Sequence, residues 1–145
     1  MQISAKGEYA IQAMLDLALH REDGLTPIQE IARRQAIPPR YLEQVLLALK
    51  RAGLLTSKRG SAGGYHLTRP PEDITVGDVL RAMEGAGAPF ERQRRGGRST
   101  ERHDLVELWD EISSAVSKVV DQLTFGDLAA RALARRSAAR PMYHI

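Results

Sequence analysis

The chain has 145 residues, of which 43% are hydrophobic and 27% charged, as in a folded globular domain with its own core. It contains no cysteine, which excludes disulfides, thiolate nucleophiles, zinc–cysteine sites and ordinary iron–sulfur ligation. No apolar run approaches the roughly 18 to 20 residues that span a bilayer, and the N-terminus does not resemble a secretory signal. We therefore expect a cytoplasmic protein that has no membrane partner.

Positive charge is concentrated in the first half of the chain. Residues 1–69 contain ten Lys or Arg against six Asp or Glu, whereas residues 70–145 contain eleven against twelve. Within residues 33–59, seven cationic side chains accompany a single acid, Glu43. This stretch suits a polyanion such as DNA, although a solvated basic face would give the same pattern.

Two helices are predicted at the start of the chain. Apolar residues at helical spacing, with Ser4 as the cap, predict a first helix over residues 4–20. A second helix is predicted to begin with the Thr26 hydroxyl as cap and Pro27 at the first helical position. Gln29 would complete a capping box with this threonine.

A third helix and a hairpin follow. Residues 39–52 carry an apolar stripe and end at Gly53, where a left-handed C-terminal cap is expected. Two β-prone segments, 54–57 and 65–67, flank a basic, glycine-rich tip at 58–64 and predict a hairpin. Helix, turn, helix and basic hairpin is the order of a winged helix-turn-helix. We therefore predict a mainly α fold with a two-stranded wing.

The third helix and the hairpin tip supply candidate DNA contacts. Arg40 can reach phosphate or guanine, Gln44 can pair with adenine, and Glu43 can accept a hydrogen bond from cytosine. The alternative for Glu43 is a salt bridge to Arg40 or Arg51. The tip is predicted to probe the minor groove, with a solvated turn as the alternative. The predicted DNA-contacting residues are Arg40, Tyr41, Glu43, Gln44, Lys50, Arg51, Lys58, Arg59, Gly60 and Ser61.

Two more helices are predicted from a repeated capping pattern. Thr75 is expected to cap a fourth helix over residues 76–84, and Thr124 a short later helix. We interpret the recurrence of this pattern as shared capping chemistry rather than as an internal repeat of the chain. Between them, residues 85–102 are rich in Gly and Arg and predict a mobile loop.

A long apolar stripe follows this loop. Its residues recur at the 4-3-4-3-4 spacing of a coiled-coil seam, which indicates a long C-terminal helix. The stripe can pack on the domain's own core or form a dimer, and we favour dimerisation because a small domain has little other core for it. The predicted dimerisation residues are Leu105, Trp109, Ile112, Val116, Val119 and Leu123.

Four ordered segments resemble one family. The segments ISAKGEYAIQAMLDLAL, YLEQVLLALKRAGLL, RGSAGGYHL and ITVGDVLRAMEG are similar to those of the bacterial winged-helix regulators that include IscR, NsrR and CymR, the Rrf-two family. The resemblance implies a homodimer with two winged heads, a crossing dimerisation helix and a partly palindromic double-stranded DNA operator. It places Glu43 and Gln44 at base-reading positions, and Arg59 and Gly60 in the minor-groove wing. Pro38 stands where many members have a polar cap, which puts the exact helix start in doubt.

The family's iron–sulfur branch has three cysteines in the loop that matches 85–102, and this chain has none. Glu8 and His103 lie near positions that supply other ligands in some members, but two such groups cannot hold a cluster. We therefore expect no cofactor. The alternative is a cluster-sensing regulator whose cysteines were lost or replaced. The chain more closely resembles the cysteine-free, CymR-like branch, which implies a repressor of cysteine metabolism.

The C-terminal sequence PMYHI also resembles that branch. Met142, Tyr143 and Ile145 would offer apolar anchors and one carboxylate, the elements by which a protein captures a C-terminus. The resemblance implies cysteine synthase, O-acetylserine thiol-lyase, as the partner of this tail. A tail that folds back on its own dimer, or is disordered, is the alternative.

No catalytic pattern accompanies these features. The sequence has no phosphate-binding loop, nucleophile elbow or metal-ligand spacing among its histidines, so we do not expect an enzyme. An interaction adaptor that has lost DNA binding remains an alternative. The expected organisation is a DNA-binding domain at 1–84, a mobile loop at 85–102, a dimerisation helix and short following helix at 103–135, and a tail at 136–145.

Overall fold

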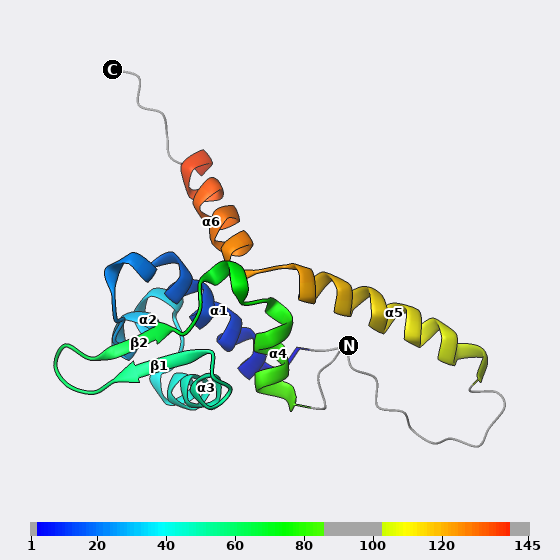
Figure 1. Ribbon diagram of the computed structural model, residues 1–145, viewed down its shortest axis with the longest axis horizontal. Helices are drawn as coiled ribbons and strands as arrows, with labels where there is room; N and C mark the ends of the chain where they lie inside the picture. Colours follow the sequence, from blue (N-terminus) through cyan, green and yellow to red (C-terminus); the bar gives the residue numbers. More distant parts are fainter. Residues whose placement is uncertain (1–2, 86–102, 140–145) are drawn as a thin grey trace.

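The computed structural model describes residues 3–85 and 103–139. Residues 3–85 form the body of the molecule, here called the head, and helix α5 (His103–Gln122) leaves it as a long arm (Figure 1). Nearly all of the predicted mobile loop and the whole of 140–145 lie outside the described residues. None of the helices in the described ranges is both long and apolar enough to cross a membrane.

Three helices form the base of the head: α1 (Ala5–Leu19), α2 (Ile28–Gln35) and α3 (Pro39–Arg51). Ser4 caps α1 as predicted, since its hydroxyl oxygen accepts a hydrogen bond from the Gly7 N–H at 3.1 Å. The apolar stripes of these helices meet in one core because each has its apolar residues at a spacing of three or four. The completely buried apolar residues of this core are Ala10, Ala13, Met14, Ile31, Leu42, Val45, Leu46, Leu49, Ile74, Val79 and Phe125.

The predicted cap of α2 is wrong. A short 3-10 helix, η1 (Arg21–Asp23), follows α1, and Pro27 rather than Thr26 occupies the N-cap position of α2, without a side-chain cap bond. Thr26 is buried, and its backbone N–H and C=O exchange hydrogen bonds with Tyr65 at 3.0 and 2.8 Å. Pairing with the hairpin holds Thr26 out of the cap position, so α2 starts one residue later than predicted, at Ile28.

The end of α3 and the hairpin agree with the prediction. Gly53 has a φ of +79°, the left-handed geometry expected after the helix. Strands β1 (Leu55–Lys58) and β2 (Gly64–Leu67) pair antiparallel, with Leu55 opposite Leu67. Both of these leucines are buried, so the base of this wing is anchored in the core while its tip extends into solvent (Figure 1).

Helices α4 (Val76–Glu84) and α6 (Phe125–Ala139) begin with the same pattern, Thr-x-Gly-Asp. In each, the threonine hydroxyl accepts a hydrogen bond from the aspartate N–H and the aspartate carboxylate accepts one from the threonine N–H, all at 3.0 Å. The predicted caps at Thr75 and Thr124 are confirmed, and the structure shows that each is a reciprocal capping box. Thr75 and Thr124 also pair as an antiparallel bridge, so the two caps together form one structure, here called the joint.

Both glycines of the joint are closely packed. A Cβ atom at Gly77 would lie 2.1 Å from an Asp121 carboxylate oxygen of α5. A Cβ atom at Gly126 would lie 2.9 Å from the side chain of Glu72, in the 3-10 helix η2 (Pro71–Asp73). Each cap therefore fits against a neighbouring segment only because its third residue has no side chain.

An ion pair joins α4 to the arm. Arg81 donates hydrogen bonds to both carboxylate oxygens of Asp121 at 2.7 and 2.8 Å, and Ser117 donates a third at 3.2 Å. The hydrogen bond from Arg81 is the main reason that the pKa of Asp121 lies below its ordinary value. The head and the arm are thus joined by a charged contact as well as by the backbone of the joint.

The start of α6 packs on the head. Phe125 at the start of α6 is fully buried in the head's core. The predicted short helix with a boundary at 135 is wrong, because α6 has 15 residues and ends at Ala139. Its alanines and arginines are strong helix formers, so the helix continues through residues that we had assigned to the tail.

Candidate nucleic-acid interface

Helix α3 has two opposite faces. Leu42, Val45, Leu46 and Leu49 are completely buried, which fixes the rotation of the helix on the core. The opposite stripe consists of side chains that are all exposed. These are Arg40, Glu43, Gln44, Leu47 and Arg51. The helix therefore presents a row of functional groups to solvent at the spacing of successive turns, as a recognition helix requires.

Glu43 is available for recognition. The alternative considered from the sequence was a salt bridge to Arg40 or Arg51. In the described ranges neither arginine lies within ion-pairing distance of Glu43, and none of the three has an ion pair elsewhere. An exposed carboxylate that is not paired to a cation can accept a hydrogen bond from a base edge.

Tyr41 lies on the flank of α3 that faces α1. Its ring centroid is 6.3 Å from that of Tyr9, with the rings inclined at 35°. Half of its surface is exposed, at 50%. Contact with Tyr9 restricts the ring while its hydroxyl can reach a partner, which is the usual arrangement for a tyrosine at an interface.

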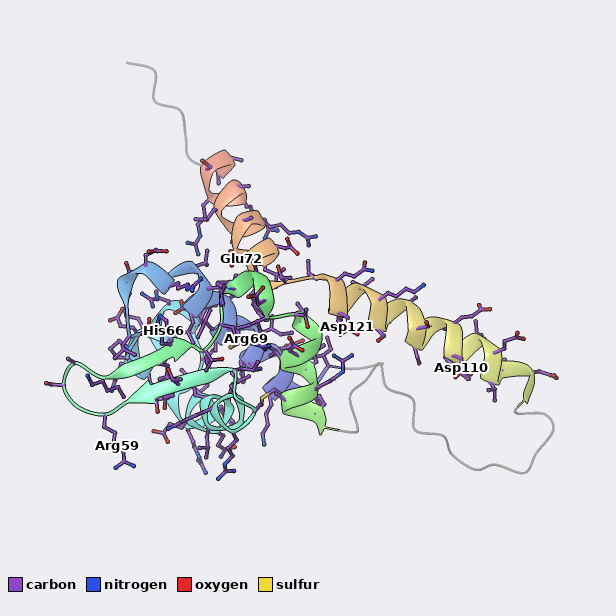
Figure 2. All side chains as sticks on the ribbon, in the orientation of Figure 1. Arg59, His66, Arg69, Glu72, Asp110 and Asp121 are labelled. Carbon is purple, nitrogen blue, oxygen red and sulfur yellow. The ribbon has the colours of Figure 1, made fainter. Side chains whose placement is uncertain are left out.

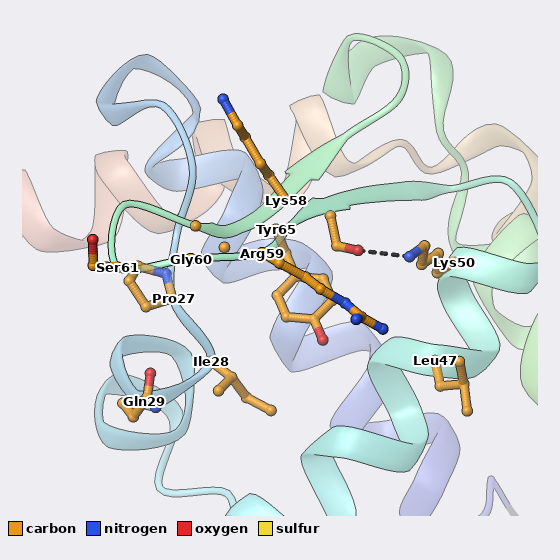
Figure 3. A pocket seen from close by; sticks show the side chains of 13 residues that line it. Pro27, Ile28, Gln29, Leu47, Lys50, Lys58, Arg59, Gly60, Ser61 and Tyr65 are labelled. Carbon is orange, nitrogen blue, oxygen red and sulfur yellow. Dashed lines mark hydrogen bonds between the residues drawn. The ribbon is translucent and has the colours of Figure 1, made fainter.

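The tip of the wing projects past the start of α2, across a groove from α3 (Figure 3). Arg59, Gly60 and Ser61 are exposed, and Gly60 has a φ of +113°, which other residues adopt only with strain. Arg59 points across Tyr65 toward α3, whereas Lys58 extends from the opposite side of the hairpin (Figure 3). The Arg59 side chain therefore lies on the side of the wing that faces α3, and the Lys58 side chain lies on the other side.

A groove of about 580 Å³ separates the wing from α2 and α3. Lys50 bridges its end by donating a hydrogen bond from Nζ to the Ser57 hydroxyl of β1 at 2.7 Å (Figure 3). This contact holds the wing relative to the recognition helix, with Lys50 and Arg59 beside the groove. The groove is lined by Pro27, Ile28, Gln29, Leu47, Lys50, Ser57, Lys58, Arg59, Gly60, Ser61, Gly63, Gly64 and Tyr65.

Two arginines of the basic stretch are paired with acids of the protein itself, Arg34 with a buried one and Arg33 with an exposed one. Arg34 donates to both carboxylate oxygens of the buried Asp16, at 3.0 and 2.9 Å, and Gln35 donates to the same carboxylate at 3.1 Å. Arg33 pairs with Glu30 at 2.8 Å, and its hydrogen bond lowers the pKa of Glu30. The cations that remain available belong to α3 and the wing, so the positive surface is smaller than the charge count implied.

Sequence reasoning missed Leu47, Ile28 and Gln29 of the groove. Leu47 could have been found, because it lies three residues after Gln44 and outside the apolar stripe of α3. The two α2 residues carry no comparable signal. They reach the groove only because Thr26 pairs with the wing and brings the start of α2 beside it.

Most side chains of the predicted dimerisation stripe are exposed to solvent. Leu105, Trp109, Ile112 and Val119 are between 39% and 63% exposed, and Leu108, which we had not predicted, is 45% exposed. The other two predicted residues differ, because Val116 and Leu123 are partly buried against the core of the head. The arm therefore combines a contact with its own head and a long exposed apolar face.

The described part of the chain has no group of three His, Asp or Glu residues placed to hold a metal ion. Glu8 is exposed on α1, and His103 is the first residue of α5. The predicted partner-binding residues Met142, Tyr143 and Ile145 lie outside the described residues.

Comparison with known sequences gives the same family that the motifs indicated. The family model described as "Rrf2: Iron-dependent Transcriptional regulator" matches residues 3–131. The transcriptional regulator CymR of Bacillus subtilis is 40% identical over 129 residues, 89% of this chain and 90% of that protein. IscR of Aliivibrio salmonicida is also 40% identical over 129 residues, 88% of this chain and 77% of that protein.

Solved structures agree. The structure described as CymR, the global cysteine regulator of B. subtilis, superposes with a TM-score of 0.78 at 36% identity, over 90% of this chain and 98% of that one. IscR of T. potens superposes with a TM-score of 0.77 at 34% identity, over 99% of this chain and 94% of that one. These matches confirm the predicted winged-helix fold and the family resemblance. The chain belongs to the Rrf2 family of transcriptional regulators.

Proposed function

We propose that the protein is a transcription regulator that binds double-stranded DNA as a homodimer in the cytoplasm and represses the genes it controls. The observation that carries the proposal is the surface formed by α3 and the wing. Among the described residues Arg40, Arg51 and Arg59 have no ion pair, and neither has Glu43. Arg40, Glu43 and Arg51 lie on the exposed side of α3, and Figure 2 shows Arg59 extending from the wing into solvent. Cations provide affinity for phosphates, and an acid among them favours particular bases over others.

In this mechanism α3 enters the major groove. Arg40 contacts phosphate or guanine, Gln44 pairs with adenine, and Glu43 accepts a hydrogen bond from the amino group of cytosine. Arg59 reaches the adjacent minor groove from the wing, where a narrow groove attracts a guanidinium group. The hydrogen bond between Lys50 and Ser57 keeps the two probes at a fixed separation.

The exposed face of the arm supports a dimer. A second copy would cover Leu105, Trp109, Ile112 and Val119, and two linked heads would contact two half-sites. We therefore propose a partly palindromic operator. Binding of both heads is then one event, which makes operator affinity depend on the dimer.

The test is selection from random duplex DNA with the full chain, followed by titrations at several salt concentrations. We expect recovery of paired half-sites and an affinity that falls steeply with salt. Arg59→Ala should weaken binding to all sequences and reduce the salt slope by about one unit. Lys58→Ala should have less effect because its side chain points away from α3, and Arg135→Ala on α6 serves as the control. Recovery of no DNA would refute the proposal and favour an adaptor.

Glu43→Ala separates specificity from affinity. This variant should lose preference for one base pair of each half-site by about 1–3 kcal/mol, while its affinity for random DNA stays the same or rises. Glu22→Ala, which removes an exposed acid from η1, is the matched control. An equal loss of affinity for operator and random DNA would contradict base reading by Glu43.

The regulated process and the signal belong to the same proposal. Similarity to CymR, described as a global cysteine regulator, supports control of cysteine metabolism. We propose that the C-terminal tail docks in cysteine synthase and competes there with O-acetylserine. Titration of that enzyme with the full chain and with a chain lacking residues 143–145 tests this. Equal binding by both, or binding unaffected by O-acetylserine, would contradict it.

A further inference from the structure

Leu47 is an apolar residue in an otherwise polar row. The residues buried on the core lie on one side of α3, and Leu47 lies opposite to them, between Gln44 and Arg51 along the exposed stripe. Its exposed fraction is 47%. In the close-up view its side chain extends from α3 into the groove below the wing (Figure 3).

Packing within the protein does not account for this position. Leu47 is neither a member of the buried core nor one of the partly buried residues packed against it. Leu47 and Lys50 line the groove from α3, whereas Ile28 and the ring of Tyr65 line it from α2 and the wing (Figure 3). Leu47 therefore adds an apolar group to the exposed side of α3 that also carries Glu43 and Gln44.

DNA offers one apolar group of matching size on its major-groove edge. The 5-methyl group distinguishes thymine from every other base there, and leucine can contact it without requiring a hydrogen bond. We propose that Leu47 is a specificity-determining residue that contacts a thymine 5-methyl group in each half-site. The inference rests on the proposed DNA-binding function and adds a contact that the polar residues of α3 cannot make.

The size of the effect follows from the group removed. Burying one methyl group changes an equilibrium constant by about three- to fivefold. The contribution of Leu47 should therefore appear at one base position and should be smaller than that of Glu43.

The experiment uses the operator recovered by selection, with each thymine in turn replaced by deoxyuridine, which lacks only the 5-methyl group. The wild-type protein should lose about three- to fivefold in affinity at one position of each half-site. Leu47→Ala should bind the unmodified operator as weakly as the wild type binds the modified one, and should show no further loss at that position. Leu47→Met, which keeps an apolar side chain, should retain most of the sensitivity.

Two controls make the result interpretable. Leu133→Ala, which shortens an exposed leucine on α6, should behave as the wild type, and thermal unfolding should be unchanged in Leu47→Ala. The inference would be overturned if deoxyuridine lowered the affinity of the wild-type protein at no position. It would also be overturned if deoxyuridine lowered the affinity of the wild type and of Leu47→Ala equally. Uniform weakening of Leu47→Ala on operator and random DNA would show a sugar–phosphate contact and would overturn it as well. These outcomes differ from failure of the proposed function, in which selection recovers no DNA.

Discussion

The head and the arm place their apolar residues in opposite ways. Leu42, Leu46 and Leu49 of α3 are completely buried among residues of the head itself. Leu105 and Trp109 of the arm are about half exposed, although the periodicity of the two helices is similar. A helix can thus show the same apolar pattern whether its partner is its own domain or another chain.

The comparison also shows where the two regions meet. The end of the arm contacts the head through Val116, Leu123 and the ion pair of Asp121 with Arg81, and the paired caps of Thr75 and Thr124 follow at once. The orientation of the head relative to the arm is therefore fixed at the joint. In a dimer this orientation sets the separation of the two recognition helices.

The largest expected effect comes from charging the face of the arm. Ile112→Glu combined with Val119→Glu should give folded monomers and lower operator affinity by at least about 100-fold, since two heads no longer bind together. Analytical ultracentrifugation and DNA titration measure both results. Ser114→Glu, an exposed position on the opposite side of the arm, should remain dimeric. A dimer that survives the double change would place the interface elsewhere.

The next effect concerns the head alone. Asp16→Ala leaves the partly buried Arg34 with only its longer contact to Glu30, at 3.8 Å, and should lower the free energy of unfolding by about 3 kcal/mol. Denaturation by urea measures the change. Glu30→Ala removes an exposed acid that pairs with Arg33 and, more distantly, with Arg34, and should change stability little. Equal losses in the two variants would mean that burial of Asp16 has no special importance.

A smaller effect is expected at the joint. Gly77→Ala places a methyl group 2.1 Å from an Asp121 oxygen, and should cost about 1–3 kcal/mol in the free energy of unfolding. Because the obstacle is that side chain, Asp121→Ala should remove most of the penalty. A double-mutant cycle provides the measurement. If the losses of Gly77→Ala and Asp121→Ala were additive in the double variant, the Asp121 side chain would not be the obstacle to the added methyl group.

The paired caps should contribute similarly to α4 and α6. Thr75→Ala and Thr124→Ala each remove the acceptor of an N-terminal hydrogen bond and should cost about 1 kcal/mol. Thr→Ser at the same positions keeps the acceptor and should cost less. Thermal unfolding of the four variants measures this, and losses that serine does not reduce would argue against capping as the cause.

The smallest effect is on pH dependence. Arg81 lowers the pKa of Asp121 in the folded protein, so the ionised carboxylate stabilises the fold above the unfolded pKa of about 4. This contribution should be lost as the pH falls through the lower, folded-state pKa, and it is small because the pair is partly exposed to solvent. Urea unfolding between pH 7 and pH 3 should show a weaker decline for Asp121→Asn than for the wild type. Identical declines would contradict the linkage.

Local sequence signals predicted much of the fold and part of the interface. The caps at Ser4, Thr75 and Thr124 and the left-handed Gly53 were all found, because each depends on residues within one helical turn. Thr26 was misjudged for the opposite reason. The local sequence suits a cap, but the backbone N–H and C=O of Thr26 form hydrogen bonds with Tyr65, which is distant in the chain.

The candidate site shows the same division. The rotation of α3 follows from its apolar stripe, so exposure of Glu43 and Gln44 could be predicted. The sequence could not predict which cations are available for DNA, because Arg34 forms an ion pair with Asp16 of another helix. Nor could sequence place Arg59 and Lys58 on different sides of the wing relative to α3 (Figure 3).

The sequence by itself determined the order of the helices, the wing, the caps at Ser4, Thr75 and Thr124 and the outward face of α3. These features depend on periodicity and short-range hydrogen bonding. Tertiary structure decided which charges face solvent, which apolar residues remain uncovered and how the two Thr-x-Gly-Asp motifs combine into a joint. Those outcomes depend on contacts between segments far apart in the chain, and the amino acids of one segment do not specify the partner that folding brings to it.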